Sequence, residues 1–302
     1  MANVDLRPLS LGEILDRTFS LYRRHFAFFL GISVLPYLLA LGLGLLQTLA
    51  LPRIGGGRQF PNLSGGVYAG AGFWLITIVV QFLAYILSQG GTVFGVSEIY
   101  LGNQTTIRES FGRMVGEFAN LFGVLVLWVL FAFGAPLVCF GAAIVFKAPG
   151  FVFLAFVLIL FPGFYLACRL MVCVPAALLE NIGPRSSLER SFSLTKGNVG
   201  RAFLIYLLYI VLAWAAASLL TWPFTAGFAA AKNDPQMVRV WLSLTQVGSF
   251  VAKVLVAPIL TIASAVYYYD LRVRKEAFDL QFMMYPGGVA PARTAGVPTM
   301  LS

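Results

Sequence analysis

The chain has 302 residues, of which 59% are hydrophobic and 11% charged, with a formal net charge of +9. An average soluble domain carries about 25% charged residues, and disordered chains are poor in apolar residues. These numbers exclude a soluble globule and a disordered chain, and they predict a protein embedded in lipid. Because the basic residues lie beside apolar segments, their charge indicates membrane orientation, and no nucleic-acid partner is predicted.

The first 25 residues are polar and amphipathic. They lack the short apolar core and the small-residue cleavage site of a signal peptide. We therefore expect the first apolar segment to remain in the protein as a membrane span.

Six stretches reach the roughly 20 apolar residues that a helix needs to cross a bilayer. They are Phe26–Leu51, Ala71–Val96, Leu121–Phe146, Gly150–Val174, Ala202–Trp222 and Val247–Tyr269. No segment alternates with the period of two that a membrane β-barrel requires. The Gly- and Pro-rich segment Pro52–Gly70 is expected to be a loop, and Pro162 is one of four prolines expected to kink their spans.

An amphipathic segment precedes the first, third and fifth spans, and the three segments share one spacing. The residues at offsets 0, 4, 7, 11 and 15 from Leu11, Ile107 and Leu188 form matching, largely apolar stripes. This spacing is typical of one face of an α-helix. The residues that precede the stripes, and that we expect to cap the helix N-termini, are Ser10, Thr106 and Ser187.

The predicted fold is an all-α membrane protein with six transmembrane helices in three parallel repeats. Each repeat, at about 10–105, 106–186 and 187–280, holds an amphipathic cytoplasmic surface helix and a transmembrane hairpin. Most Lys and Arg residues lie on the side of the surface helices, which predicts that this side and both termini are cytoplasmic. Residues 1–280 are expected to form one polytopic domain, and residues 281–302 a disordered tail.

Basic residues in or next to the surface helices are candidate contacts for anionic lipid headgroups, each contributing about 1 kcal/mol. The candidates are Arg17, Arg24, Arg113, Arg190 and Arg201. The same charges also suffice to set the topology, and both interpretations stay open.

Arg169 lies inside the fourth span, where insertion of a charge at the helix centre costs about 2.5–3.5 kcal/mol. Glu98, Glu180 and Asp270 occur at the cytoplasmic ends of even-numbered spans and are its candidate partners in an intramembrane polar cluster. A structural ion pair and a polar cavity in which Arg169 holds an anionic group both fit this placement. Lys253, in the outer part of the sixth span, is expected to extend toward the outer surface.

We find no catalytic, cofactor-binding or metal-binding motif in the chain, so neither an enzyme nor a cofactor is predicted. The one histidine, His25, follows Arg24 at the start of the first span, and the usual nucleotide and zinc motifs do not occur. The cysteines lie in apolar runs and are expected to pack as small apolar side chains. They are Cys139, Cys168 and Cys173.

Three segments resemble a known family. RPLSLGEILDRTFSLYRRHF, PAALLENIGPRSSLERSFSLTKGNVGRAF and YYYDLRVRKEAFDL are similar to the bacterial glycerophosphoryl diester phosphodiesterase membrane-domain family, and the resemblance spans nearly all of residues 5–280. It implies a stand-alone membrane part in a bacterial plasma membrane. The catalytic barrel of some members is missing here, and no catalytic residue is carried over.

The leading hypothesis is a non-enzymatic membrane protein that organises or binds lipids or partner proteins at its cytoplasmic face. Arg169 inside a kinked bundle motivates one alternative, a transporter or channel for a small, anionic solute. The family name alone motivates another, a membrane-embedded hydrolase of lipid phosphodiesters. No particular partner protein is predicted, and homo-oligomerisation stays open.

Overall fold

The computed structural model describes residues 8–55, 63–100, 102–148, 150–230 and 234–276, and these residues are helical apart from short connections. Six segments are long and apolar enough to cross a membrane, which indicates a multi-pass membrane protein. They are Phe26–Leu49, Leu75–Tyr100, Phe118–Phe146, Gly150–Glu180, Val199–Gly227 and Gln236–Glu276. The tail expected at 281–302 lies outside the described residues.

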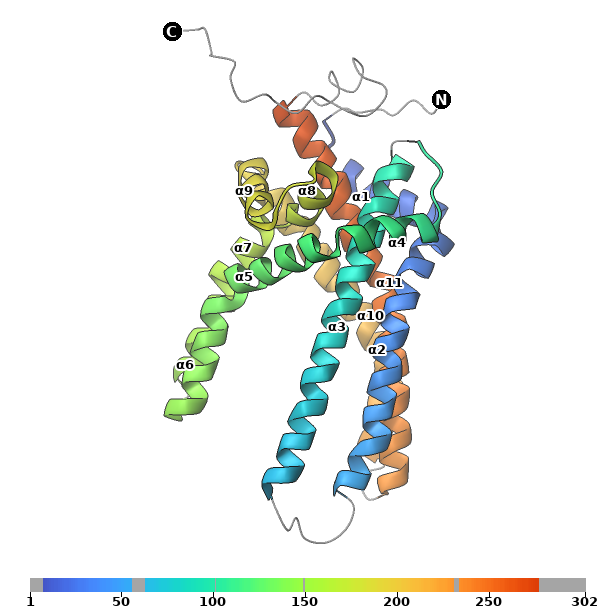
Figure 1. Ribbon diagram of the computed structural model, residues 1–302, viewed down its shortest axis with the longest axis vertical. Helices are drawn as coiled ribbons and strands as arrows, with labels where there is room; N and C mark the ends of the chain where they lie inside the picture. The colour runs from blue at the N-terminus through green and yellow to red at the C-terminus, as the bar shows by residue number, and fades with distance from the viewer. Residues whose placement is uncertain (1–7, 56–62, 101, 149, 231–233, 277–302) are drawn as a thin grey trace.

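Three short helices, α1 (Leu11–Arg24), α4 (Ile107–Gly116) and α9 (Pro184–Thr195), lie at one end of the bundle (Figure 1). We call this end the surface-helix end. Each of the three helices is followed along the chain by a long apolar helix. This order matches the expected order of elements, while the threefold repeat itself stays a prediction.

The starts of the surface helices follow two different rules. Ser10 and Thr106 each cap a helix through a capping box, in which a glutamate three residues later bonds back to the cap backbone. The prediction for Ser187 was wrong, because α9 begins earlier, at Pro184. Proline suits the first helical position, where its missing N–H needs no partner. Ser187 is therefore inside the helix, and its hydroxyl donates to the Pro184 carbonyl.

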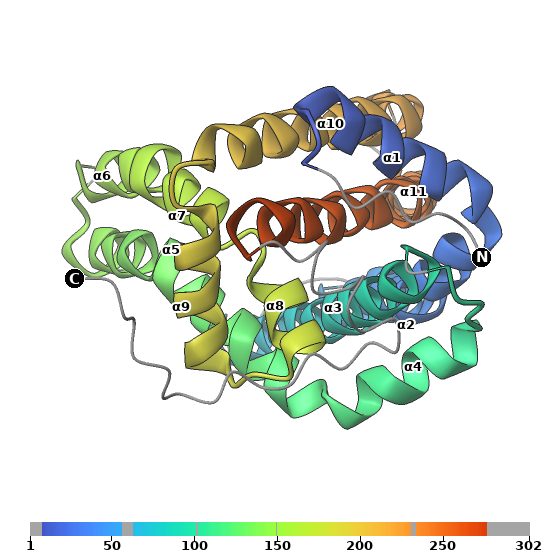
Figure 2. The same cartoon turned by 90° about the horizontal axis from the view of Figure 1, so that it is seen from above.

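Four long helices run along the bundle axis: α2 (Phe26–Gly55), α3 (Leu63–Tyr100), α10 (Val199–Ala230) and α11 (Pro235–Glu276). Viewed from the surface-helix end, α11 lies between α2 and α3 on one side and α1 and α10 on the other (Figure 2). Every residue from 261 to 271 is buried, so this part of α11 forms the centre of the core.

The loop expected at Pro52–Gly70 is shorter than predicted. Helix α2 continues to Gly55 and α3 begins at Leu63, and only residues 56–62 fall outside the described part of the chain. A continued helix satisfies its own backbone hydrogen bonds, whereas the helix propensity of glycine is unfavourable by only about 1 kcal/mol per residue.

The fourth span is interrupted rather than continuous. It consists of α6 (Gly150–Leu158), a π-helical turn η1 (Ile159–Gly163), α7 (Phe164–Arg169) and α8 (Cys173–Glu180). Pro162 lies in the π-turn, at the kind of position where a residue without an N–H disturbs helical hydrogen bonding. A second break at residues 170–172 separates α7 from α8.

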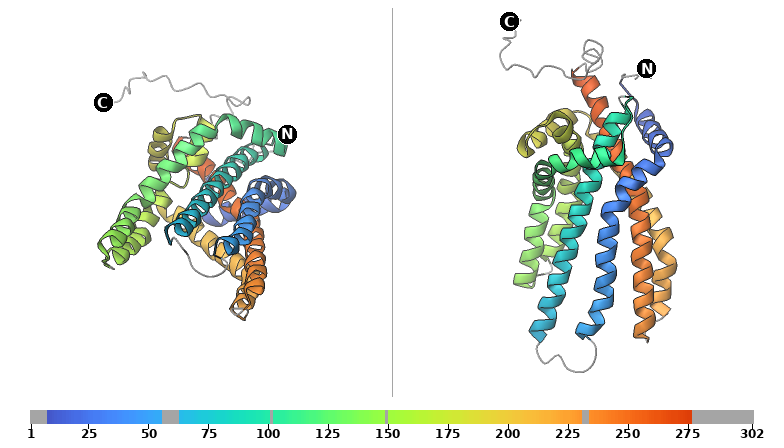
Figure 3. Two further views of the ribbon diagram at one scale, coloured as in Figure 1. Left: turned by 60° about the horizontal axis from the view of Figure 1, so that its bottom comes forward. Right: turned by 45° about the vertical axis from the view of Figure 1, so that its right-hand side comes forward.

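Helix α6 packs against α5 (Phe118–Phe146), and together they form a hairpin. The hairpin diverges from the other long helices with distance from the surface-helix end (Figure 3). Its far end exposes large apolar side chains, such as Val145 and Phe153, which are 74% and 71% exposed. Such surfaces are stable only against lipid or another protein.

Candidate functional site

The most deeply buried charge of the surface-helix end is Asp270 on α11, whose side chain is fully buried. Its carboxylate accepts hydrogen bonds from the Leu9 backbone N–H at 2.7 Å, from Arg201 at 3.2 Å and from Arg274 at 3.0 Å. Arg201 and Arg274 also donate to the Leu9 carbonyl. Asp270 therefore joins the segment before α1, the start of α10 and the end of α11.

A second ion-pair network joins α8, α9 and α11. Arg190 on α9 donates to Glu180 at 2.8 Å and to Glu276 at 2.8 Å, and Arg272 donates to Glu276 at 3.2 Å. The Tyr268 hydroxyl donates to Glu180 at 2.7 Å. Two carboxylates thus face two guanidinium groups, so the network is close to neutral and holds α9 on the bundle.

The guanidinium of Arg190 stays charged inside this network. Partial burial acts to lower its pKa, but hydrogen bonds to Glu276 and Glu180 and the charges of both carboxylates outweigh it and raise the pKa above the ordinary value. Arg190 is therefore a structural ion-pair partner. Because two carboxylates compensate most of its charge, little of that charge is available to a lipid headgroup.

The third acidic residue, Glu98 at the end of α3, pairs with Arg113 on α4 and accepts a hydrogen bond from Asn103. Arg17 on α1 donates to the Tyr100 hydroxyl at 2.9 Å, and the Tyr100 ring stacks on Tyr269. Each surface helix is thus fixed to the bundle through at least one arginine.

These contacts separate the predicted site residues into two groups. Glu98, Glu180 and Asp270 each pair with an arginine other than Arg169, so the structure does not bring the expected cluster together. Among the five candidate headgroup contacts, only Arg24 is both exposed and outside the ion pairs of the described residues. The other four are Arg17, Arg113, Arg190 and Arg201, and all of them make side-chain contacts within the protein.

Arg169 lies at the level of a surface helix rather than in the middle of the bundle. Its carbonyl accepts hydrogen bonds from Ser191 and Thr195 of α9, and its guanidinium lies 5.0 Å above the Phe192 ring. Within the described residues, no carboxylate oxygen comes within 4.0 Å of this guanidinium. Its charge is therefore not neutralised by an ion pair there.

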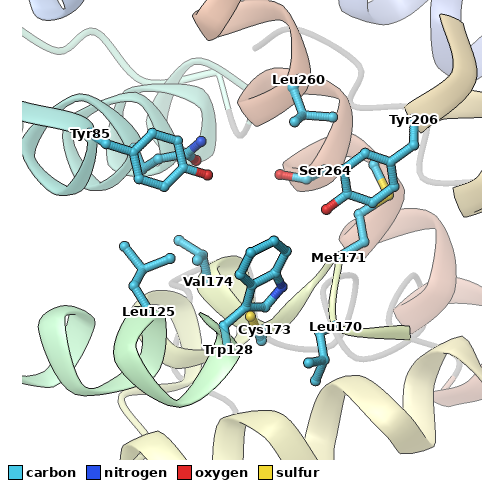
Figure 4. A pocket seen from close by; sticks show the side chains of 11 residues that line it. Tyr85, Leu125, Trp128, Leu170, Met171, Cys173, Val174, Tyr206, Leu260 and Ser264 are labelled. Carbon is cyan, nitrogen blue, oxygen red and sulfur yellow. The ribbon is translucent and has the colours of Figure 1, made fainter. Parts of the chain in front are cut away.

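A polar cavity of about 30 Å³ lies where the fourth span is interrupted. Figure 4 shows the hydroxyls of Tyr85, Tyr206 and Ser264 pointing into one space, with the Trp128 ring beside it. The volume suffices for about two water molecules. Arg169 does not line this cavity, although the next residue along the chain, Leu170, does.

A second, mainly apolar cavity of about 10 Å³ lies between α1, α10 and α11. Its lining includes Leu15, Tyr209 and Ala263, and Arg169 does not line it either. The exposed His25 occupies the junction of α1 and α2, where its backbone N–H donates to the Leu21 carbonyl.

Sequence reasoning missed the arginines that neutralise the acidic residues. Asp270–Arg274 and Arg272–Glu276 have the four-residue spacing of helical ion pairs, so part of the network was visible in YYYDLRVRKE. The role of the Leu9 backbone has no such signal, because almost every residue type has the same backbone N–H and carbonyl, and the sequence does not show which of them are buried.

Comparisons with protein-family models, with curated proteins and with solved structures found no match to this chain. The resemblance to the glycerophosphoryl diester phosphodiesterase membrane-domain family therefore stays a prediction.

Proposed function

We propose that the protein is a non-enzymatic integral membrane protein that binds and organises anionic lipids at the cytoplasmic face. One observation carries the proposal: three surface helices are fixed at one end of the bundle, and further basic side chains remain exposed beside them. Ion pairs hold α4 and α9, and hydrogen bonds of Leu9 and Arg17 hold α1. Arg23, Arg24 and Arg108 are exposed and make no ion pair within the described residues. Each such charge near an anionic membrane surface contributes about 1 kcal/mol.

The cytoplasmic orientation rests on the excess of Lys and Arg at the surface-helix end. A bacterial plasma membrane is the setting that the family resemblance implies. The non-enzymatic part rests on the sequence, which holds a single histidine, the exposed His25, and no catalytic motif. The same exposed face would also be available to a partner protein.

The test measures which lipids co-purify with the full chain from membranes. In a variant with Arg23→Gln, Arg24→Gln and Arg108→Gln, we expect the ratio of anionic to zwitterionic lipid to fall several-fold. Arg185→Gln is the matched control, because Arg185 is also exposed but pairs with Glu189 at 3.1 Å. An unchanged ratio in the triple variant would rule out the proposal. The ion-paired Arg113 and Arg190 are poor choices, because their loss would loosen the fold as well.

A transporter or channel is the second candidate. Interrupted spans at a polar cavity are a recurring feature of transporters, and the cavity beside residues 170–172 has this arrangement. The sequence suggested a transporter because of Arg169, but the Arg169 side chain does not line this cavity and so does not support this candidate there. Flux of small polar solutes into proteoliposomes would support this candidate, provided that Ser264→Ala or Tyr206→Phe changes the rate.

A further inference from the structure

Three basic side chains gather where α7, α9 and α11 meet, and this cluster is distinct from the ion-pair networks. Lys275 on α11 donates to the carbonyls of Ser193 and Lys196, at 2.7 and 2.8 Å, and so closes the C-terminal end of α9. The charges of Arg169 and Lys196 both act on the Lys275 ammonium and repel it. The cluster therefore consists of Arg169, Lys196 and Lys275.

The protein supplies little negative charge to this cluster. Within the described residues, none of the three side chains makes an ion pair with a carboxylate. The C-terminus of α9 contributes only about half an elementary negative charge against three positive charges. By contrast, the charge of Arg190, six residues before Lys196, is compensated by Glu180 and Glu276.

Hydrogen-bonding capacity also remains. The ammonium of Lys275 has three donors, of which two are used by α9 carbonyls. No hydrogen bond within the described residues occupies the guanidinium of Arg169, whose face rests on Phe192. Lys196 is exposed. A phosphate oxygen is the acceptor that such a set of donors favours.

An exposed apolar surface begins next to the cluster. Tyr165 lies one turn before Arg169 on α7 and is 54% exposed. Phe203 lies in the second turn of α10, seven residues after Lys196, and is 43% exposed. Phe164 packs edge-to-face on Phe203 with ring centroids 5.5 Å apart, so α7 and α10 form one continuous surface. This surface sits on the bilayer side of the basic cluster, as acyl chains do relative to a phosphate.

We infer that Arg169, Lys196 and Lys275 bind the phosphate of one anionic phospholipid, whose acyl chains lie against α7 and α10. The inference rests on the proposed function and names the site at which a lipid is held specifically. A free phosphate ion shares the headgroup chemistry but would make no use of the exposed surface around Tyr165 and Phe203.

The experiment uses the full chain in detergent and titrates it with a synthetic phosphatidylglycerol or phosphatidylcholine, with bound lipid counted by native mass spectrometry. We expect one tightly bound phosphatidylglycerol and much weaker phosphatidylcholine binding. The double variant Arg169→Gln with Lys196→Gln should weaken phosphatidylglycerol binding about 30-fold. Each lost positive charge costs about 1 kcal/mol of binding free energy, and about 2 kcal/mol corresponds to that factor. Arg185→Gln, at the other end of α9, should leave it unchanged.

Further variants keep the outcome interpretable. Lys196→Gln alone changes an exposed side chain and should weaken binding about fivefold even if the double variant folds poorly. Arg169→Lys with Lys196→Arg keeps both charges and should retain binding. The triple variant at Arg23, Arg24 and Arg108 should still bind the one lipid, which separates this site from the general lipid binding proposed above.

Three results would overturn the inference. Equal affinity for phosphatidylcholine would show that the charges do not select the lipid. Displacement of the lipid by millimolar inorganic phosphate would assign the site to a soluble anion. Unchanged affinity in both the double variant and Lys196→Gln would remove the cluster from the site altogether.

Discussion

The Leu9 backbone N–H donates a 2.7 Å hydrogen bond to the fully buried carboxylate of Asp270, 261 residues further along the chain. Two arginines share this carboxylate and the Leu9 carbonyl. One acidic residue thus fixes the segment before α1 to the last helix, and the stability of the surface-helix end depends on it.

Asp270→Asn should destabilise the protein strongly. It removes the only carboxylate that the described structure places between Arg201 and Arg274, and breaking a buried pair by removing one partner costs about 3–5 kcal/mol. Unfolding in mixed micelles measures the loss. Glu189→Gln, which alters a pair with side chains 68% and 91% exposed, should change the free energy of unfolding by less than about 1 kcal/mol. Similar effects of both variants would contradict the role given to Asp270.

The pair Glu180–Arg190 should show energetic coupling. Both side chains are mostly buried, at 18% and 24% exposed, and pairs in one network couple by about 0.5–3 kcal/mol. A double-mutant cycle with Glu180→Gln and Arg190→Gln measures this coupling from the free energy of unfolding. The same cycle on Arg185 and Glu189 should give about 0.3–0.5 kcal/mol. Additive effects at Glu180 and Arg190 would show that the network does not hold α9.

Gly248 marks a close approach of α10 and α11. A Cβ atom at this position would lie 2.5 Å from the Leu220 carbonyl oxygen, which belongs to the backbone of the facing helix. Gly248→Ala should therefore force the helices apart and destabilise the protein by about 1–3 kcal/mol.

Gly141→Ala is the matched control for the Gly248 variant, because a Cβ at Gly141 meets no atom within 4 Å. Alanine favours a helix interior by about 0.5–1 kcal/mol over glycine. Thermal unfolding in detergent should shift down for Gly248→Ala and not for Gly141→Ala. A neutral result at Gly248 would mean that the two helices are not in close contact.

The proposed topology places Lys147 and Arg185 on opposite sides of the membrane. Both are exposed, and single cysteines there can be introduced after Cys139, Cys168 and Cys173 are replaced by alanine. A membrane-impermeant maleimide should label Lys147→Cys in intact cells and Arg185→Cys only after the cells are disrupted. Labelling of both in intact cells would contradict the multi-pass arrangement.

The helices that cross the bundle could be predicted because their signal is local. The apolar run predicted at Leu121–Phe146 needs no partner to be recognised, and the described helix, Phe118–Phe146, begins three residues earlier and ends at the same residue. The expected caps at Ser10 and Thr106 were also confirmed, since a capping box lies within four residues. The interruption at residues 170–172 was not predicted, although Pro175 in the first turn of α8 is a local signal for it, because a proline cannot donate the helical hydrogen bond to the carbonyl of Met171.

The charge pairing could not be predicted in full, because it depends on how helices distant in the sequence pack. The sequence offered Arg169 three acidic candidates, but each has a nearer arginine on another element, as Glu98 has in Arg113. The basic cluster at Lys196 and Lys275 could not be predicted either, because these residues lie 79 positions apart in the sequence.

The contact between Leu9 and Asp270 also constrains how the chain is made. Leu9 precedes Asp270 by 261 residues, so this contact cannot form during synthesis until α11 has been made. A second contact between α1 and α11 forms equally late, because the Tyr22 hydroxyl donates its hydrogen bond to the carbonyl of Leu255. Pairing between such distant positions is slow to form. Until α11 is in place, the amphipathic helix α1 therefore lacks two of its contacts to the bundle, and the membrane surface offers its apolar face an alternative partner.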